Sequence, residues 1–150
     1  MDRMNKEELI KFIENLGIDS EEFIILSSSS LVMRDLFESA GDLDIAVTKK
    51  GLDQLKEKFN VVNTHDDWYQ VNERCECVLD DELESKREKV GNYYLQDLNY
   101  YRSFLVNSDR PKDKIRLEIV NKALNKWCFF SYSTKSRLLF FVFDFILELE

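Results

Sequence analysis

Asp42 and Asp44, two aspartates separated by one residue, are the side chains in this chain best suited to chemistry. They open an apolar run that ends at Val47 and is typical of a buried β-strand. Alternate residues of a strand point to the same face, so the two carboxylates would stand about 6–7 Å apart along the chain. Because like charges held so close repel each other, a divalent cation between them would turn the conflict into a binding site.

The residues before this pair predict the elements that position it. An apolar run over 22–27 is typical of a buried strand, and the four serines 27–30 indicate a tight polar turn. A short helix over 30–38 would then lead back to the acidic strand, 43–48. The pattern is therefore strand, turn, helix and acidic strand.

The rest of the chain alternates between helical and strand-like spacing. Its first helix would start after Asn5 and end at Gly17. The later predicted elements are helices over 51–59, 92–106 and 112–124, strands over 61–62, 68–71 and 74–79, and a charged loop or helix start over 80–89. This order predicts an α+β fold with α/β-like alternation, in which helices flank a mixed sheet of about four to five strands.

Composition limits the class of protein. The formal net charge of −8 argues against a broad electrostatic footprint on nucleic acid, while a local basic groove stays open. Three cysteines without CxxC spacing indicate reduced thiols, and Cys75 and Cys77 are expected to be packing residues. The start of the chain leads into an amphipathic helix rather than an apolar leader. We therefore expect a soluble, cytoplasmic protein.

The last residues differ in character from the rest. Residues 127–150 contain six phenylalanines and no clear period, and their longest apolar run, 138–147, includes Asp144. A membrane-spanning helix needs about 20 apolar residues, so we expect no membrane partner. We expect one domain over 1–126. Residues 127–150 would pack on this domain or on a partner, and that partner could be a second copy of the chain in a homodimer.

Two segments carry a resemblance to a known family. Residues 25–47 resemble the signature of the polymerase-β-like nucleotidyltransferase superfamily: a strand, a Gly-Gly-Ser or Gly-Gly-Thr turn, a helix, and Asp-x-Asp in the next strand. Here Ser27, Ser28 and Ser29 stand in place of the turn residues. Residues 98–113, which include Arg110-Pro-Lys-Asp, are similar to the ending of small single-domain members, among them antibiotic-modifying and toxin-type proteins.

The resemblance implies a nucleotidyltransferase fold and transfer of an NMP from an NTP to the hydroxyl of an unknown acceptor: a small molecule, an RNA end or a protein. It implies Mg²⁺, or Mn²⁺, held by Asp42, Asp44 and a third carboxylate. We choose Glu76 as the third, because an acid between apolar strand residues is unusual. Asp80 and Glu73 stay open, as does a Glu76 that faces solvent.

The same resemblance implies that the triphosphate lies over the turn and the following helix start. The residues implied in nucleotide binding are Ser28, Ser29, Arg34, Arg102, Arg110 and Lys112. For the basic residues of the second segment, ion pairs with Asp113 or contacts with helix ends are an equal alternative.

One departure from the family pattern bears on activity. Ser27 and Ser28 replace both glycines, and each added Cβ narrows the pocket and restricts the backbone. The alternative function is therefore a catalytically weak or inactive protein of the same fold that binds or regulates a partner, as an antitoxin does.

Overall fold

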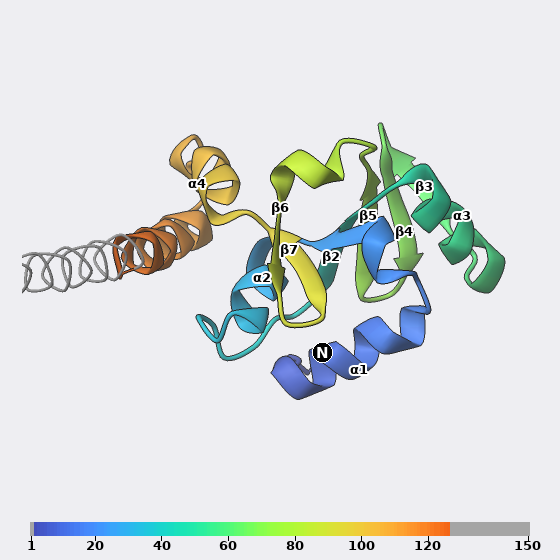
Figure 1. The fold of residues 1–150 in the computed structure, drawn as a ribbon, viewed down its shortest axis with the longest axis horizontal. Coiled ribbons are helices and arrows are strands. Elements are labelled where there is room, and N and C mark those ends of the chain that lie inside the picture. The colour runs from blue at the N-terminus through green and yellow to red at the C-terminus, as the bar shows by residue number, and fades with distance from the viewer. Residues whose placement is uncertain (1, 127–150) are drawn as a thin grey trace, which may run out of the picture. The chain divides into compact units, whose positions relative to one another are not determined.

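The structure is a computed structural model that describes residues 2–126 (Figure 1). The chain divides into two compact units, Met1–Tyr101 and Arg102–Glu150. The first unit contains Asp42, Asp44 and Glu76. The expectations for residues 127–150, packing on the domain or forming a homodimer, fall outside the described residues.

A seven-stranded mixed sheet forms the centre of the first unit, with the strand order β3-β4-β5-β2-β1-β7-β6 (Figure 1). β2 runs parallel to β5 and β1 runs parallel to β7, while the other neighbours are antiparallel. The strands are β1 (Phe23–Ile25), β2 (Leu43–Val47), β3 (Val62–His65), β4 (Trp68–Asn72), β5 (Cys75–Leu79), β6 (Arg87–Val90) and β7 (Tyr93–Gln96). The predicted α+β class and mixed sheet are confirmed, with more strands than expected.

Helices precede or connect these strands. The α-helices are α1 (Lys6–Leu16), α2 (Ser27–Met33), α3 (Lys49–Lys58) and α4 (Leu98–Val106), and the 3₁₀ helices are η1 (Ser20–Glu22) and η2 (Leu83–Lys86). α1 begins with the predicted capping box of Asn5 and Glu8 and ends at Gly17, whose φ of 64° suits glycine. None of the helices in the described part of the chain has the length and apolar character that crossing a bilayer requires.

The prediction of one helix over 92–106 was wrong. Tyr93–Gln96 form β7, where Leu95 pairs with Ile25 of β1, and α4 starts only at Leu98. The boundary lies at Asp97, whose carboxylate accepts a hydrogen bond from the Tyr100 N–H at 3.0 Å. Long-range pairing with β1 and a local N-cap therefore divide the segment into a strand and a helix.

Two further expectations need correction. The serine run 27–30 is not a separate turn but the first turn of α2. The stretch 80–89 was predicted to be a loop or helix start, and it holds the short helix η2 but also most of β6. β6 forms because it pairs with the next strand, β7, in an antiparallel hairpin.

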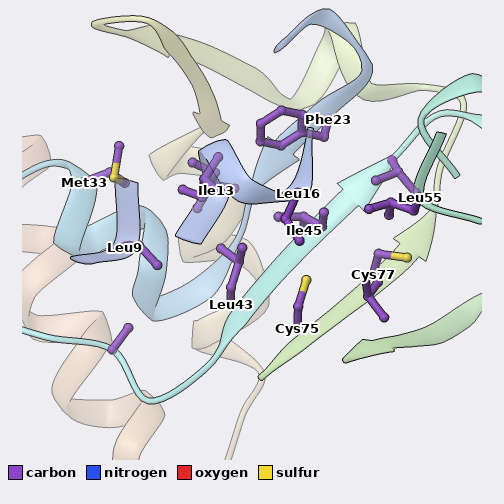
Figure 2. Packing of buried hydrophobic residues seen from close by; sticks show 14 of the residues in the cluster. Leu9, Ile13, Leu16, Phe23, Met33, Leu43, Ile45, Leu55, Cys75 and Cys77 are labelled. Atoms are coloured by element: carbon purple, nitrogen blue, oxygen red, sulfur yellow. The ribbon is translucent and has the colours of Figure 1, made fainter. Parts of the chain in front are cut away.

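The main core lies on one face of the sheet (Figure 2). α1 contributes Leu9, Ile13 and Leu16, which pack with residues of β2 and β5 that include Ile45 and Cys77. The opposite face carries a smaller apolar cluster of Ile24, Ala46 and Leu83, with Leu26, Val78 and Tyr94 packed against it. Because side chains alternate along a strand, residues 44 and 76 lie on this second face, where fewer apolar side chains pack against the sheet.

In the second unit, the end of α4 is followed by a helix over 111–126. In the first turn of this helix the carboxylate of Asp113 is fully buried and accepts hydrogen bonds from Ser108 Oγ and Arg110 Nε, both at 2.6 Å, and from Arg116 Nη1 at 3.3 Å. The Arg-Pro-Lys-Asp segment thus builds the helix start, as expected for Pro111 at the first helical position.

Candidate functional site

Asp44 and Glu76 are direct neighbours on adjacent parallel strands. Their Cα atoms are partners in the register of β2 and β5, between the pairs Leu43–Cys75 and Ile45–Cys77. Neighbouring strands lie about 5 Å apart, so the two side chains share one small area of the sheet. Both residues are half-buried, where two like charges side by side repel each other more strongly than they would in water.

The residues that flank this pair explain why it is held in place. Leu43, Ile45, Cys75 and Cys77 are all buried in the main core on the other face. A shift of either strand by one residue would move these apolar side chains out and bring the carboxylates in. The core therefore fixes which way Asp44 and Glu76 point.

The two cysteines behind the pair are packing residues, as predicted. Both are buried free thiols. Burial raises the pKa of the Cys75 thiol far above its ordinary value, and the nearby Cys77, Asp44 and Glu76 raise it further. Burial raises the pKa of Cys77 to about 11. Neutral thiols of this kind are poor nucleophiles and poor metal ligands.

Asp42 lies just before β2 and is exposed. Its backbone carbonyl accepts a hydrogen bond from Ser29 Oγ at 2.8 Å. The carbonyl of Asp44 accepts one from the Leu26 N–H at 2.9 Å. The segment from Leu26 to Ser29 thus holds the backbone of both aspartates.

The other two candidates for the third carboxylate lie elsewhere. Asp80, one residue beyond β5, forms an ion pair with Lys86 at 2.7 Å. Burial raises the pKa of Asp80, but the hydrogen bonds from Lys86 and the Glu82 N–H, together with the charge of Lys86, outweigh it and hold the pKa of Asp80 below its ordinary value. Glu73 is exposed in the connection between β4 and β5. Of these three acids, Glu76 is the one in register with Asp44.

The donor chemistry of the site fits a hard divalent cation, because Mg²⁺ and Mn²⁺ prefer carboxylate oxygens. Asp44 and Glu76 supply two such groups side by side, and Asp42, the predicted third ligand, lies just before β2. Over residues 2–126, no group of three or more His, Cys, Asp and Glu side chains is gathered closely enough to hold an ion. The three-carboxylate metal site stays a prediction.

The serine run has an unusual backbone. Ser27 adopts a left-handed conformation with φ of 52°, which glycine adopts more readily than residues with a Cβ. Its N–H donates to Gln96 Oε1 at 3.1 Å, and its carbonyl accepts from Ser30 Oγ at 2.6 Å. Ser28 is half-buried, and Ser29 is buried with its hydroxyl bonded to Asp42. The first glycine position of the family pattern thus keeps a glycine-like backbone.

Gln96 is a residue that sequence reasoning missed. It is 8 % exposed and ends β7, within the segment that was predicted to be a helix. Gln96 could have been placed beside β1 only if residues 93–96 had been predicted to form a strand. No local signal in the sequence marks its contact with Ser27.

Arg34 is committed to structural contacts. Its side chain is 6 % exposed, and Nη2 donates to Glu88 Oε2 at 3.1 Å and to the Gln96 carbonyl at 2.8 Å. Burial lowers the pKa of Arg34, while Glu88 opposes this. The side chain joins the end of α2 to β6 and β7, so a nucleotide would have to compete for it.

The remaining basic candidates belong to the second unit. Arg110 pairs with Asp113, which is the alternative that the sequence left open for it. Arg102 and Lys112 are exposed. Sequence reasoning therefore grouped residues from both units, and the first unit contains Asp42, Asp44, Glu76, Ser28, Ser29 and Arg34.

Comparison with known proteins gives a fold but no family. No protein-family model matches the chain, and no curated protein matches its sequence. Among solved structures, the Megavirus polyadenylate synthase is similar with a TM-score of 0.54 and 11% identity, over 78% of this chain and 31% of that chain. This chain thus spans less than a third of that protein's length. The likeness shows that the chain has a nucleotidyltransferase-type fold.

Proposed function

We propose that this protein is a metal-dependent nucleotidyltransferase that transfers an NMP from an NTP to the hydroxyl of an acceptor. The observation that carries the proposal is the in-register pair of Asp44 and Glu76 on the less covered face of the sheet. The nucleotidyltransferase-type fold supports the same reaction class. The acceptor is a small molecule, an RNA end or a protein.

The chemistry of the pair favours a divalent cation as its ligand. Two half-buried carboxylates on neighbouring strands repel each other, and that repulsion is relieved when a divalent ion binds. Asp44 and Glu76 would hold Mg²⁺ or Mn²⁺, with Asp42 as the third ligand. A bound ion would neutralise charge on the phosphates of the NTP.

The serine run would contribute to nucleotide binding in a restricted way. Because the Ser29 hydroxyl is bonded to the Asp42 carbonyl, Ser29 acts by orienting Asp42. Contact with the nucleotide then falls to Ser28, which is half-buried on the first turn of α2. Arg34, the basic candidate of the first unit, is already paired with Glu88.

A second candidate function rests on the serines themselves. Ser27 and Ser28 add Cβ atoms where the family has glycine, which restricts the approach of phosphates to the backbone. A protein that binds an NTP but does not transfer the nucleotide would act as a regulatory or antitoxin-like partner. The two functions differ in transfer, not in nucleotide binding.

Thermal unfolding with each of the four NTPs, in Mg²⁺, in Mn²⁺ and in EDTA, tests the proposal. We expect stabilisation by an NTP only with metal, and its loss in Asp44→Asn and Glu76→Gln. Glu57→Gln, which removes an exposed charge of α3, is the matched control and should behave as wild type. Absence of any NTP-linked stabilisation would contradict the proposal. Metal-dependent binding without transfer of a labelled NMP to any acceptor tested would favour the second function.

A further inference from the structure

The turn at Ser27 lies between the two contacts that hold the acidic pair. On one side, the Leu26 N–H donates to the Asp44 carbonyl at 2.9 Å. On the other side, Ser29 Oγ donates to the Asp42 carbonyl at 2.8 Å. The backbone conformation at Ser27 therefore determines whether both contacts can form together.

That conformation is one that serine does not adopt easily. A φ of 52° brings the Cβ close to the backbone, and outside glycine such angles persist where neighbouring groups hold them. Ser30 Oγ binds the Ser27 carbonyl at 2.6 Å from within the same helix. The Ser27 N–H donates to Gln96 Oε1 at 3.1 Å, and this is a contact with a different element, β7.

Gln96 is well placed to hold the turn. Its side chain comes from a strand that pairs with β1, and the residue is buried. Its backbone carbonyl accepts a hydrogen bond from Arg34 Nη2 at 2.8 Å, and Arg34 is the residue that follows α2. Gln96 thus contacts the segment 27–34 at both of its ends.

We propose that Gln96 is a positioning residue: by accepting the Ser27 N–H it stabilises the left-handed turn and so fixes the backbone of Asp42 and Asp44. A glycine at position 27 would adopt this backbone conformation without a Cβ, so the serine creates the need for Gln96. The consequence for metal binding rests on the proposed function. The positioning itself does not.

A cycle of two substitutions tests this link. Gln96→Ala removes the acceptor, and Ser27→Gly removes the Cβ that makes the turn unfavourable. If Gln96 acts through Ser27, Gln96→Ala should be harmful alone and nearly harmless in the Ser27→Gly background. Gln54→Ala, which removes another glutamine amide that contacts Asp19, is the matched control.

Amide hydrogen exchange at Leu26 reads the positioning without any metal. We expect exchange about tenfold faster in Gln96→Ala, because the left-handed backbone of Ser27 loses the contact that holds it, and close to the Ser27→Gly rate in the double variant, where glycine adopts that backbone unaided. An unchanged Leu26 exchange rate in Gln96→Ala would overturn the inference. So would a result in which Gln96→Ala speeds exchange by the same factor in wild type and in the Ser27→Gly background. If Gln96→Ala does not fold, comparison of the double variant with Ser27→Gly alone still decides: equal Leu26 rates support the inference, and a faster rate in the double variant overturns it.

Mn²⁺ affinity, measured by calorimetry with ATP present, links positioning to the site. We expect about tenfold weaker binding in Gln96→Ala and recovery in the double variant, a rescue that a structural role elsewhere in β7 would not produce. If Gln96→Ala weakens Mn²⁺ binding and Ser27→Gly does not restore it, the inference is overturned. Absence of Mn²⁺ binding in wild type would contradict the proposed function. If the exchange at Leu26 still showed the coupling between Gln96 and Ser27, the positioning role of Gln96 would be supported all the same.

Discussion

Asp44 of β2 faces Glu76 of β5 across two parallel strands, in a register fixed by buried neighbours on both sides of each residue. The main core lies behind the pair, and only a small apolar cluster lies on the face where it stands. A fold selected for stability alone would place an apolar or oppositely charged pair there. This pair is the basis of our proposal that a cation binds there.

Glu76→Gln should stabilise the protein when metal is absent. Removing one charge of a cross-strand like-charge pair relieves about 0.2–1 kcal/mol of repulsion. The midpoint of thermal unfolding in EDTA should rise, and added Mg²⁺ should stabilise wild type more than the variant. Glu57→Gln serves as the charge-matched control. A lower midpoint in EDTA with an unchanged Mg²⁺ effect would count against a cation between Asp44 and Glu76.

Arg34→Met should destabilise the first unit whether or not a nucleotide is present. The substitution leaves Glu88 and the Gln96 carbonyl without the guanidinium that they share, at a cost of about 1–3 kcal/mol in the free energy of unfolding. Urea unfolding measures this cost, and Arg34→Lys should restore only part of it. A variant as stable as wild type that has lost NTP-linked stabilisation would instead show that Arg34 serves the nucleotide.

The carboxylate of Asp113 makes the stability of the second unit depend on pH. Burial favours the neutral form, but the hydrogen bonds from Ser108 and Arg110 outweigh it, so the pKa in the folded protein lies below the ordinary 3.8. A lowered pKa means that the stabilisation is complete above the ordinary value and is lost as pH falls through the folded value. Asp113→Ala should therefore cost about 1–3 kcal/mol at pH 7 and progressively less in acid. Far-UV circular dichroism of urea unfolding at several pH values measures the difference, and a pH-independent cost would contradict this role.

The buried thiols predict resistance to modification. With the pKa of Cys77 raised to about 11 by burial, and that of Cys75 raised further, neither forms a thiolate at pH 8. In a Cys128→Ser background, a disulfide reagent such as DTNB should label these two thiols only as fast as the protein unfolds. Rapid labelling of the native protein at pH 8 would show that the sheet opens around β5.

The candidate site shows what the sequence can and cannot predict. Apolar neighbours on both sides of residues 44 and 76 were enough to predict a strand around each acid, and the structure has β2 and β5 there. The parallel register that makes Asp44 and Glu76 neighbours depends on pairing between distant segments, for which local pattern carries no signal. The same limit explains Gln96, whose strand had been predicted as a helix.

The basic residues illustrate a second limit. Arg34 and Arg110 were selected by their place in a motif, but each is paired with a nearby carboxylate, Glu88 and Asp113. A guanidinium forms similar bidentate contacts with a carboxylate and with a phosphate, so residue type does not separate a structural ion pair from a nucleotide contact. Burial and partner geometry separate them, and both need the fold.

The most direct test of the account is a crystal structure with Mn²⁺ and a non-hydrolysable NTP, in which anomalous scattering locates the ion. We predict an Mn²⁺ peak between Asp44 and Glu76, within about 2.0–2.4 Å of a carboxylate oxygen of each and in contact with a phosphate oxygen. Asp42 should complete the ligand set. A bound NTP whose Mn²⁺ ion contacts neither Asp44 nor Glu76 would contradict the central claim.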